Sequence, residues 1–114
     1  MPHFIIECSA PVMAMKSPEE IIQKVYDTAE ATELFSKGDI KVRIHPYTHY
    51  TIGNTKDDFI HVFSYIMEGR SHAEKNMLAK RLVTELKLLF PNVPIVSINI
   101  KDFEKVGYCN KSMV

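Results

Sequence analysis

The sequence contains only four glycines in 114 residues, and none of them forms the G-x-G-x-x-G or P-loop pattern that cradles phosphates. Nucleotide cofactors are therefore not expected. No G-x-S-x-G turn is present to expose a serine nucleophile. Cysteine is also scarce: Cys8 and Cys109 lie at opposite ends without C-x-x-C spacing, which argues against a zinc site or a redox pair. We expect two free thiols, with Cys8 buried in a strand.

The chain also has no net excess of positive or negative charge. The 14 Lys and Arg residues balance 14 Asp and Glu residues, so no net positive field exists to hold nucleic acid or an anionic membrane. The segment His3-Phe4-Ile5-Ile6 lacks the basic and long apolar regions of a signal peptide, and no apolar run approaches the ~20 residues that a membrane-spanning helix needs. We expect a cytoplasmic protein with neither nucleic acid nor a membrane as partner.

The histidines do not indicate a metal site. His45 and His49 are four residues apart, but Pro46 lies between them and no helical pattern surrounds them. They should therefore not form the paired ligands of a helical metal centre. We expect no metal and no other cofactor.

The residues that are present predict one domain over residues 1–114, because 46% of them are hydrophobic and the length suits a single core. Residues His3–Cys8 are rich in strand formers. Ser17-Pro18-Glu19-Glu20 combines an N-cap, a proline at the first helical position and an acidic residue three after the cap, which predicts a helix from Pro18 to about Phe35. Apolar and polar residues then alternate from Ile40 to His45, which predicts a strand that Pro46 limits or bends.

The second half repeats this order. Phe59–Met67 is a run of strand formers, and Ser71-His72-Ala73-Glu74 is a second capping box before leucines at helical spacing. Pro91 should stop that helix, and Ile95–Ile100 should be the last strand. The two cap serines lie 71 − 17 = 54 residues apart, so the chain resembles a duplicated β-α-β unit.

The predicted fold class is α+β, with a four-stranded mixed sheet and two helices on one face, because right-handed crossovers place both helices on the same side. The other face would carry a semi-apolar row that water does not favour. We expect other subunits to bury this row, in a dimer or a trimer. Its members are Phe59, His61, Phe63, Tyr65 and Met67.

The second residue offers a candidate catalytic group. Removal of Met1 would leave Pro2 with a free secondary amine in a ring that restricts its motion. Free α-amino groups titrate at about 7.7 to 8.0, and burial or a nearby cation lowers this further, so such a group suits proton transfer at neutral pH. The alternative is that proline is merely a common second residue.

A base acting on an anionic substrate also needs cations. Arg70 follows the third strand and precedes the Ser71 cap, where backbone N–H groups attract anions. Lys41 and Arg43 project from one face of the second strand. Each of the three could equally be an ordinary solvated residue.

Three segments occur in order along nearly the whole chain: Met-Pro-His-Phe-Ile-Ile-Glu-Cys-Ser at the start, Asp39-Ile40-Lys41-Val42-Arg43, and Phe59-Ile60-His61-Val62 leading to Gly69-Arg70-Ser71. Together they resemble the 5-carboxymethyl-2-hydroxymuconate delta-isomerases of the tautomerase superfamily.

The resemblance implies a homotrimer of (β-α-β)2 subunits in which Pro2, after loss of Met1, shuttles a proton without a cofactor. The substrate would be a dicarboxylate or tricarboxylate dienol, such as 5-carboxymethyl-2-hydroxymuconate from homoprotocatechuate degradation, and it would be ketonised to the 2-oxo-enoate. Arg70 matches an arginine that binds substrate carboxylates. The second-strand arginine of familiar members falls at Lys41, while Arg43 matches a further basic position, so either could hold a second carboxylate.

Three alternatives stay open from the sequence, one of which is a purely structural assembly protein that forms oligomers without binding a small molecule. The chain could be a tautomerase for another α-keto or dienol acid. It could also be a non-catalytic oligomeric domain that binds a small ligand, because fold does not fix function. A binding domain would tolerate Pro2→Ala and a blocked amino terminus.

Overall fold

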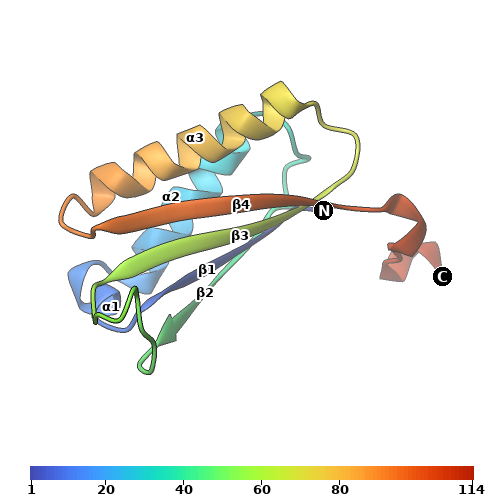
Figure 1. The fold of residues 1–114 in the computed structure, drawn as a ribbon. Helices are drawn as coiled ribbons and strands as arrows, with labels where there is room; N and C mark the ends of the chain where they lie inside the picture. Colours follow the sequence, from blue (N-terminus) through green and yellow to red (C-terminus); the bar gives the residue numbers. More distant parts are fainter.

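The computed structural model describes residues 1–114 and contains the predicted duplication (Figure 1). The first unit consists of β1 (His3–Ser9), α2 (Pro18–Ala31) and β2 (Lys41–Tyr47). The second unit consists of β3 (Phe59–Met67), α3 (His72–Leu89) and β4 (Ile95–Phe103). The strand order is β2-β1-β3-β4, with parallel pairs inside each unit and an antiparallel β1–β3 pair at the centre. The predicted α+β class and the four-stranded mixed sheet are confirmed.

Each long helix begins at the serine that the sequence marks. Ser17 Oγ accepts a hydrogen bond from the Glu20 N–H at 3.2 Å, and Pro18 occupies the first turn, where its missing N–H costs nothing. Ser71 and Glu74 form a reciprocal capping box, with bonds of 3.1 and 2.8 Å. These bonds satisfy backbone N–H groups that a helix start otherwise leaves unpaired.

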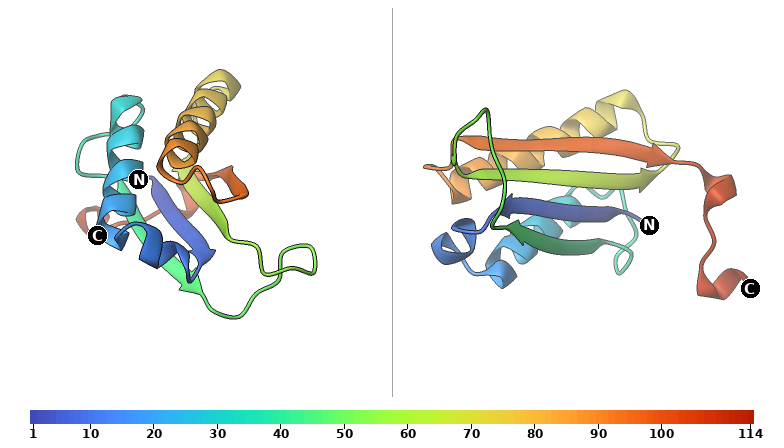
Figure 2. Two further views of the ribbon diagram at one scale, coloured as in Figure 1. Left: turned by 90° about the vertical axis from the view of Figure 1, so that its left-hand side faces the viewer. Right: turned by 60° about the horizontal axis from the view of Figure 1, so that its bottom comes forward.

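Both long helices lie on the same face of the sheet, as Figure 2 shows from two sides. The core fills the space between the two layers, and alternate residues of every strand point into it. Its fully buried members from the strands are Phe4, Ile6, Cys8, Ile60 and Val62, and those from the two long helices are Ile21, Val25, Ala29, Leu78, Leu82 and Leu86.

The remaining residues of each strand point to the opposite side, which we call the open face. The β3 residues of the open face are half-buried or exposed, in contrast to their buried neighbours Ile60, Val62 and Ile66. They are the semi-apolar row identified in the sequence: Phe59, His61, Phe63, Tyr65 and Met67.

The helix α2 ends at Ala31, four residues before the predicted end at Phe35. The Thr32 N–H still bonds to the Ala29 carbonyl, but Glu33 has a φ of 60°, a left-handed conformation that turns the chain out of the helix. Leu34 and Phe35 fit an apolar helical pattern and yet lie in the connection to β2. The prediction for this helix end was wrong.

The other boundaries differ less. β2 includes Pro46, which is tolerated because β2 is an edge strand and needs no N–H donor on its outer side. β4 continues three residues beyond the predicted Ile100, since Lys101–Phe103 still pair with the end of β3. Three short helices were not predicted: α1 (Val12–Met15) and two 3-10 turns at Lys105–Gly107 and Lys111–Met113.

The last residues leave β4 at the end of the sheet where the N-terminus also lies (Figures 1 and 2). No helix is both long and apolar enough to cross a membrane. Both cysteines are free and Cys8 is buried, as predicted, while Cys109 is exposed.

Candidate active site

The candidate base Pro2 lies immediately before β1, and less than 2% of its side chain is exposed. Its carbonyl accepts a hydrogen bond of 3.0 Å from the Lys41 N–H, which begins the parallel β1–β2 ladder. The ladder therefore sets the position of the amino terminus relative to β2. The buried core residue Phe4 follows two positions later on the helix-covered face.

Arg70 lies in the turn that follows β3, and its side chain is held by two backbone carbonyls. Gly69, with a φ of 120°, allows the chain to turn here, because residues with a Cβ rarely adopt this conformation. Arg70 Nη1 donates to the Met67 carbonyl at 3.1 Å, and Nη2 donates to the Leu34 carbonyl at 2.7 Å. The guanidinium carbon also lies 5.0 Å from the centre of the Phe35 ring.

Lys41 extends toward the amino terminus. Its Nζ lies 3.0 Å from the Asp39 carbonyl oxygen and 3.7 Å from the sulfur of Met1. Lys41 is therefore the cation of β2 that lies beside the end of the chain.

Arg43 makes a different contact. Its Nη1 lies 3.2 Å from His3 Nδ1 on the open face of the sheet. Of the three cations that the sequence singled out, the structure thus brings Arg70 and Lys41 toward the amino terminus and pairs Arg43 with His3.

The surroundings of the amino terminus disfavour a positive charge. The pKa of the Met1 amine is lowered, first because burial removes water and then because Arg70 and Lys41 are nearby cations, while Asp39 acts in the opposite direction. The pKa of His3 is also lowered, by burial and by the charges of Arg43, Lys41 and the amino terminus. The Met1 amine therefore stays neutral to lower pH than a free α-amino group, and the charges of Arg70 and Lys41 both act on it.

Sequence reasoning missed four contributors to this site: His3, Leu34, Phe35 and Asp39. Leu34 acts through its carbonyl, which no side-chain pattern marks. Phe35 fits the helical spacing of α2, so local periodicity assigned it to the wrong element. His3 directly follows Pro2, and Asp39 lies two residues before Lys41, so closeness in sequence to the candidate residues is the signal that could have found them.

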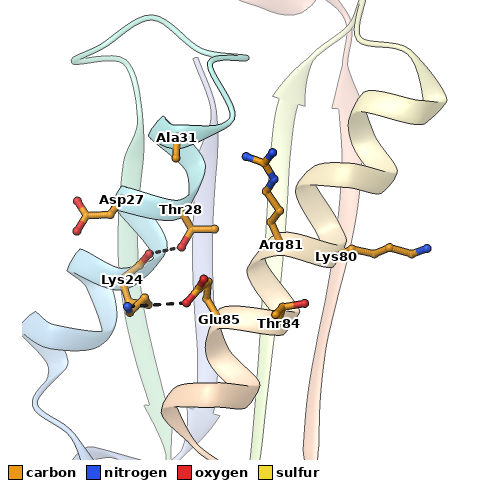
Figure 3. Close-up of a pocket in the computed structure, with 8 residues that line it drawn as sticks. All are labelled: Lys24, Asp27, Thr28, Ala31, Lys80, Arg81, Thr84 and Glu85. Carbon is orange, nitrogen blue, oxygen red and sulfur yellow. Dashed lines mark hydrogen bonds and ion pairs between the residues drawn. The ribbon is translucent and has the colours of Figure 1, made fainter.

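A groove between the two long helices is a second place where a ligand could lie, and it differs in character. It encloses about 560 Å³ and is lined by Lys24, Asp27, Thr28, Ala31, Lys80, Arg81, Thr84 and Glu85 (Figure 3). Lys24 and Glu85 approach to 3.8 Å across it, and both side chains are about 40% exposed. Its charges are mixed and solvated, and its lining includes neither Pro2 nor the amino terminus.

Comparison with known proteins gives a consistent result. Residues 2–109 match the family model of 5-carboxymethyl-2-hydroxymuconate isomerase. A 5-carboxymethyl-2-hydroxymuconate Delta-isomerase from Escherichia coli is 28% identical over 92 residues, which cover 79% of this chain and 73% of that protein.

Two solved structures illustrate the likeness of the fold. A 5-carboxymethyl-2-hydroxymuconate isomerase from Deinococcus radiodurans R1 superposes with a TM-score of 0.85 at 24% identity, covering 96% of this chain and 88% of that one. A fused 4-OT protein, described as a symmetric trimer, gives a TM-score of 0.81 at 10% identity, covering 98% and 95% of the two chains.

Proposed function

Since this chain belongs to the 5-carboxymethyl-2-hydroxymuconate isomerase family and is an isomerase of the tautomerase superfamily, we propose that it ketonises a 2-hydroxy-dienoate with Pro2 as the proton carrier. Two observations support this most directly: Pro2 is buried with its carbonyl bonded to the Lys41 N–H, and the charges of Arg70 and Lys41 lower the pKa of the neighbouring Met1 amine. The proposed substrate is 5-carboxymethyl-2-hydroxymuconate. Membership of an enzyme family favours this over a non-catalytic binding domain.

The proposed reaction begins after removal of Met1, which converts the Pro2 nitrogen from an amide into a secondary amine. The neutral amine accepts the proton of the substrate 2-hydroxyl group, and the oxygen becomes a carbonyl as electrons move along the diene. The resulting ammonium then delivers a proton to carbon. One proton leaves oxygen and one reaches carbon, so the product is an isomer and no cofactor is required.

Arg70 and Lys41 would hold the carboxylates of the substrate. A guanidinium has five N–H donors, and Arg70 uses two on carbonyls, which leaves three for a ligand. Lys41 is a point donor and cannot grip a carboxylate with two parallel bonds. We therefore propose Arg70 as the principal carboxylate ligand, with Lys41 or, further along β2, Arg43 as the second.

We also propose that the protein is a homotrimer with sites between subunits. The semi-apolar open face supports this, because its half-buried aromatic side chains would lose contact with water on assembly. The described trimer of the fused 4-OT protein has the same fold.

The test is the rate of ketonisation of 5-carboxymethyl-2-hydroxymuconate, followed by ultraviolet absorbance, with protein shown by mass spectrometry to lack Met1. Pro2→Ala should lower kcat/KM by at least about 100-fold, in the range of general acid–base catalysis. Pro11→Ala is a matched control at an exposed position and should leave the rate unchanged. A wild-type rate equal to that in buffer would exclude this substrate, and equal rates for wild type and Pro2→Ala would exclude the proline mechanism.

A further inference from the structure

The segment between α2 and β2 reaches the end of the sheet where the amino terminus lies (Figure 1). Glu33 enters this segment with a φ of 60°, a conformation that costs energy for any residue with a Cβ. The departure of the chain from the helix places the next two residues, Leu34 and Phe35, against Arg70. The turn at Glu33 therefore positions Leu34 and Phe35 against the Arg70 guanidinium.

Phe35 contacts both the guanidinium and the first strand. Its ring centre lies 5.0 Å from the Arg70 guanidinium carbon, a distance at which a cation is attracted to an aromatic face. The same ring makes an edge contact with Phe4, with ring centres 6.0 Å apart and planes at 77°. Phe4 is fully buried and follows Pro2 by two residues. The ring of Phe35 therefore connects the position of Arg70 to that of the candidate base.

Two hydrogen bonds to backbone carbonyls and the contact with the ring of Phe35 together restrict the Arg70 guanidinium. An arginine held in this way loses less freedom when it binds a carboxylate than one that is free in solvent. Phe35 itself carries no group that could transfer a proton.

We propose that Phe35 is a positioning residue for substrate binding, acting through Arg70. This inference rests on the proposed function, in which Arg70 binds a substrate carboxylate. Loss of the aromatic face releases the guanidinium and weakens binding, while the proton transfer at Pro2 continues at nearly its normal rate once substrate is bound.

The experiment compares Phe35→Leu, which keeps apolar bulk, with Phe35→Tyr, which keeps the aromatic face. We expect Phe35→Leu to raise KM about 10-fold and change kcat less than 2-fold, and Phe35→Tyr to resemble the wild type. Phe90→Leu is the matched control: Phe90 is a core residue, 3% exposed, that follows α3, so this variant should lower thermal stability without raising KM.

A double-mutant cycle separates an action through Arg70 from an independent effect. If Phe35 acts through the guanidinium, Phe35→Leu raises KM in the wild type but adds nothing to Arg70→Gln. An unchanged KM in Phe35→Leu, or the same increase in both backgrounds, would overturn the proposal.

Nuclear magnetic resonance of the arginine side chains gives a readout that does not depend on turnover. The Arg70 Nε–H resonance, assigned by its absence in Arg70→Gln, should be displaced by the ring current in the wild type and in Phe35→Tyr, and should move to the region of free arginines in Phe35→Leu. If the wild type shows this shift but ketonises nothing, the proposed function fails and the contact stands. If the wild type is active and the resonance is the same in all three proteins, the positioning role fails and the function stands.

Discussion

The backbone N–H of Lys41 donates a 3.0 Å hydrogen bond to the carbonyl of Pro2. This bond links the last residue before β1 to the first residue of β2, so the side chain of Lys41 is held beside the amino terminus by the sheet itself. The pairing of β1 with β2 therefore fixes how close the Lys41 charge lies to the amino-terminal amine.

The first prediction concerns the pH dependence of kcat/KM. The Pro2 amine must be neutral to accept a proton, so activity should fall as the pH drops through the pKa of the amine. Burial lowers the pKa of the Met1 amine, Arg70 and Lys41 lower it further and Asp39 raises it, and we expect the same charges to act on the adjacent Pro2 nitrogen once Met1 is removed. Lys41→Met should therefore move the acidic limb of the profile to higher pH, and Asp39→Asn should move it to lower pH. Limbs that coincide in all three proteins would show that these charges do not act on the base.

The second prediction concerns assembly through the open face. Wild-type protein should have a mass in solution of about 39 kDa, three times the chain mass of 13.1 kDa, by light scattering after size exclusion. Phe63→Glu places a charge in the semi-apolar row and should give monomers, because an unpaired buried carboxylate is costly. Lys80→Glu should remain trimeric, since Lys80 is exposed on α3, which lies on the other side of the sheet from the open face (Figure 2). A trimeric Phe63→Glu protein would place the interface elsewhere.

The third prediction concerns Cys8. Burial raises the pKa of its thiol to about 11, so in the folded protein it stays protonated at pH 8 and lacks the nucleophilic thiolate. Iodoacetamide at pH 8 should label Cys8 only after denaturation, as mapped by mass spectrometry. In the unfolded chain the thiol ionises at lower pH, so the stability of the protein should decrease as the pH rises above about 9 and this decrease should be smaller in Cys8→Ala. Rapid labelling of the native protein would contradict the buried position.

The fourth prediction concerns Ser64. Its side chain is 1% exposed, and its Oγ has no hydrogen-bond partner. Ser64→Ala removes an unpaired buried hydroxyl and should raise the free energy of unfolding by about 1 kcal/mol in urea denaturation. Ser97→Ala is the contrasting control, because Ser97 Oγ lies 2.6 Å from His61 Nδ1 and its loss should not stabilise the protein. A less stable Ser64→Ala protein would mean that the hydroxyl is paired.

The sequence predicted the helix starts and the strands, because short-range capping and alternation patterns determine them. Ser17 and Ser71 mark the starts of the two long helices because a serine side chain caps the N–H groups three residues away. The alternation around Val42 and Ile60 marks strands because one face of the sheet is covered. The sequence also singled out Pro2, Arg70, Lys41 and Arg43 as candidate site residues; in the structure Arg70 and Lys41 act on the amino-terminal amine, and Arg43 contacts His3.

The remaining features depend on distant contacts. No glycine or proline follows Ala31 before Gly38, so nothing local predicts that α2 stops where it does. After this turn the Leu34 carbonyl accepts a hydrogen bond from Arg70, and the Phe35 ring packs against Phe4. Both contacts are with residues of other elements, which local periodicity does not register. Likewise, β4 continues past Ile100 into Lys101 and Asp102, polar residues that periodicity excludes but that the end of β3 pairs with.

The antiparallel junction of β1 and β3 has a further consequence. Because these central strands run in opposite directions, the beginning of the first β-α-β unit and the end of the third strand meet at one end of the sheet. If the two units ran in the same direction, the nine residues of β3 would separate Arg70 from Pro2 by about 30 Å. The proposed proton carrier thus comes from the first half of the chain and the proposed principal cation from the second. Fragments cut in the connection between β2 and β3 would each be inert, and activity would return only when the two pieces are mixed and recombine.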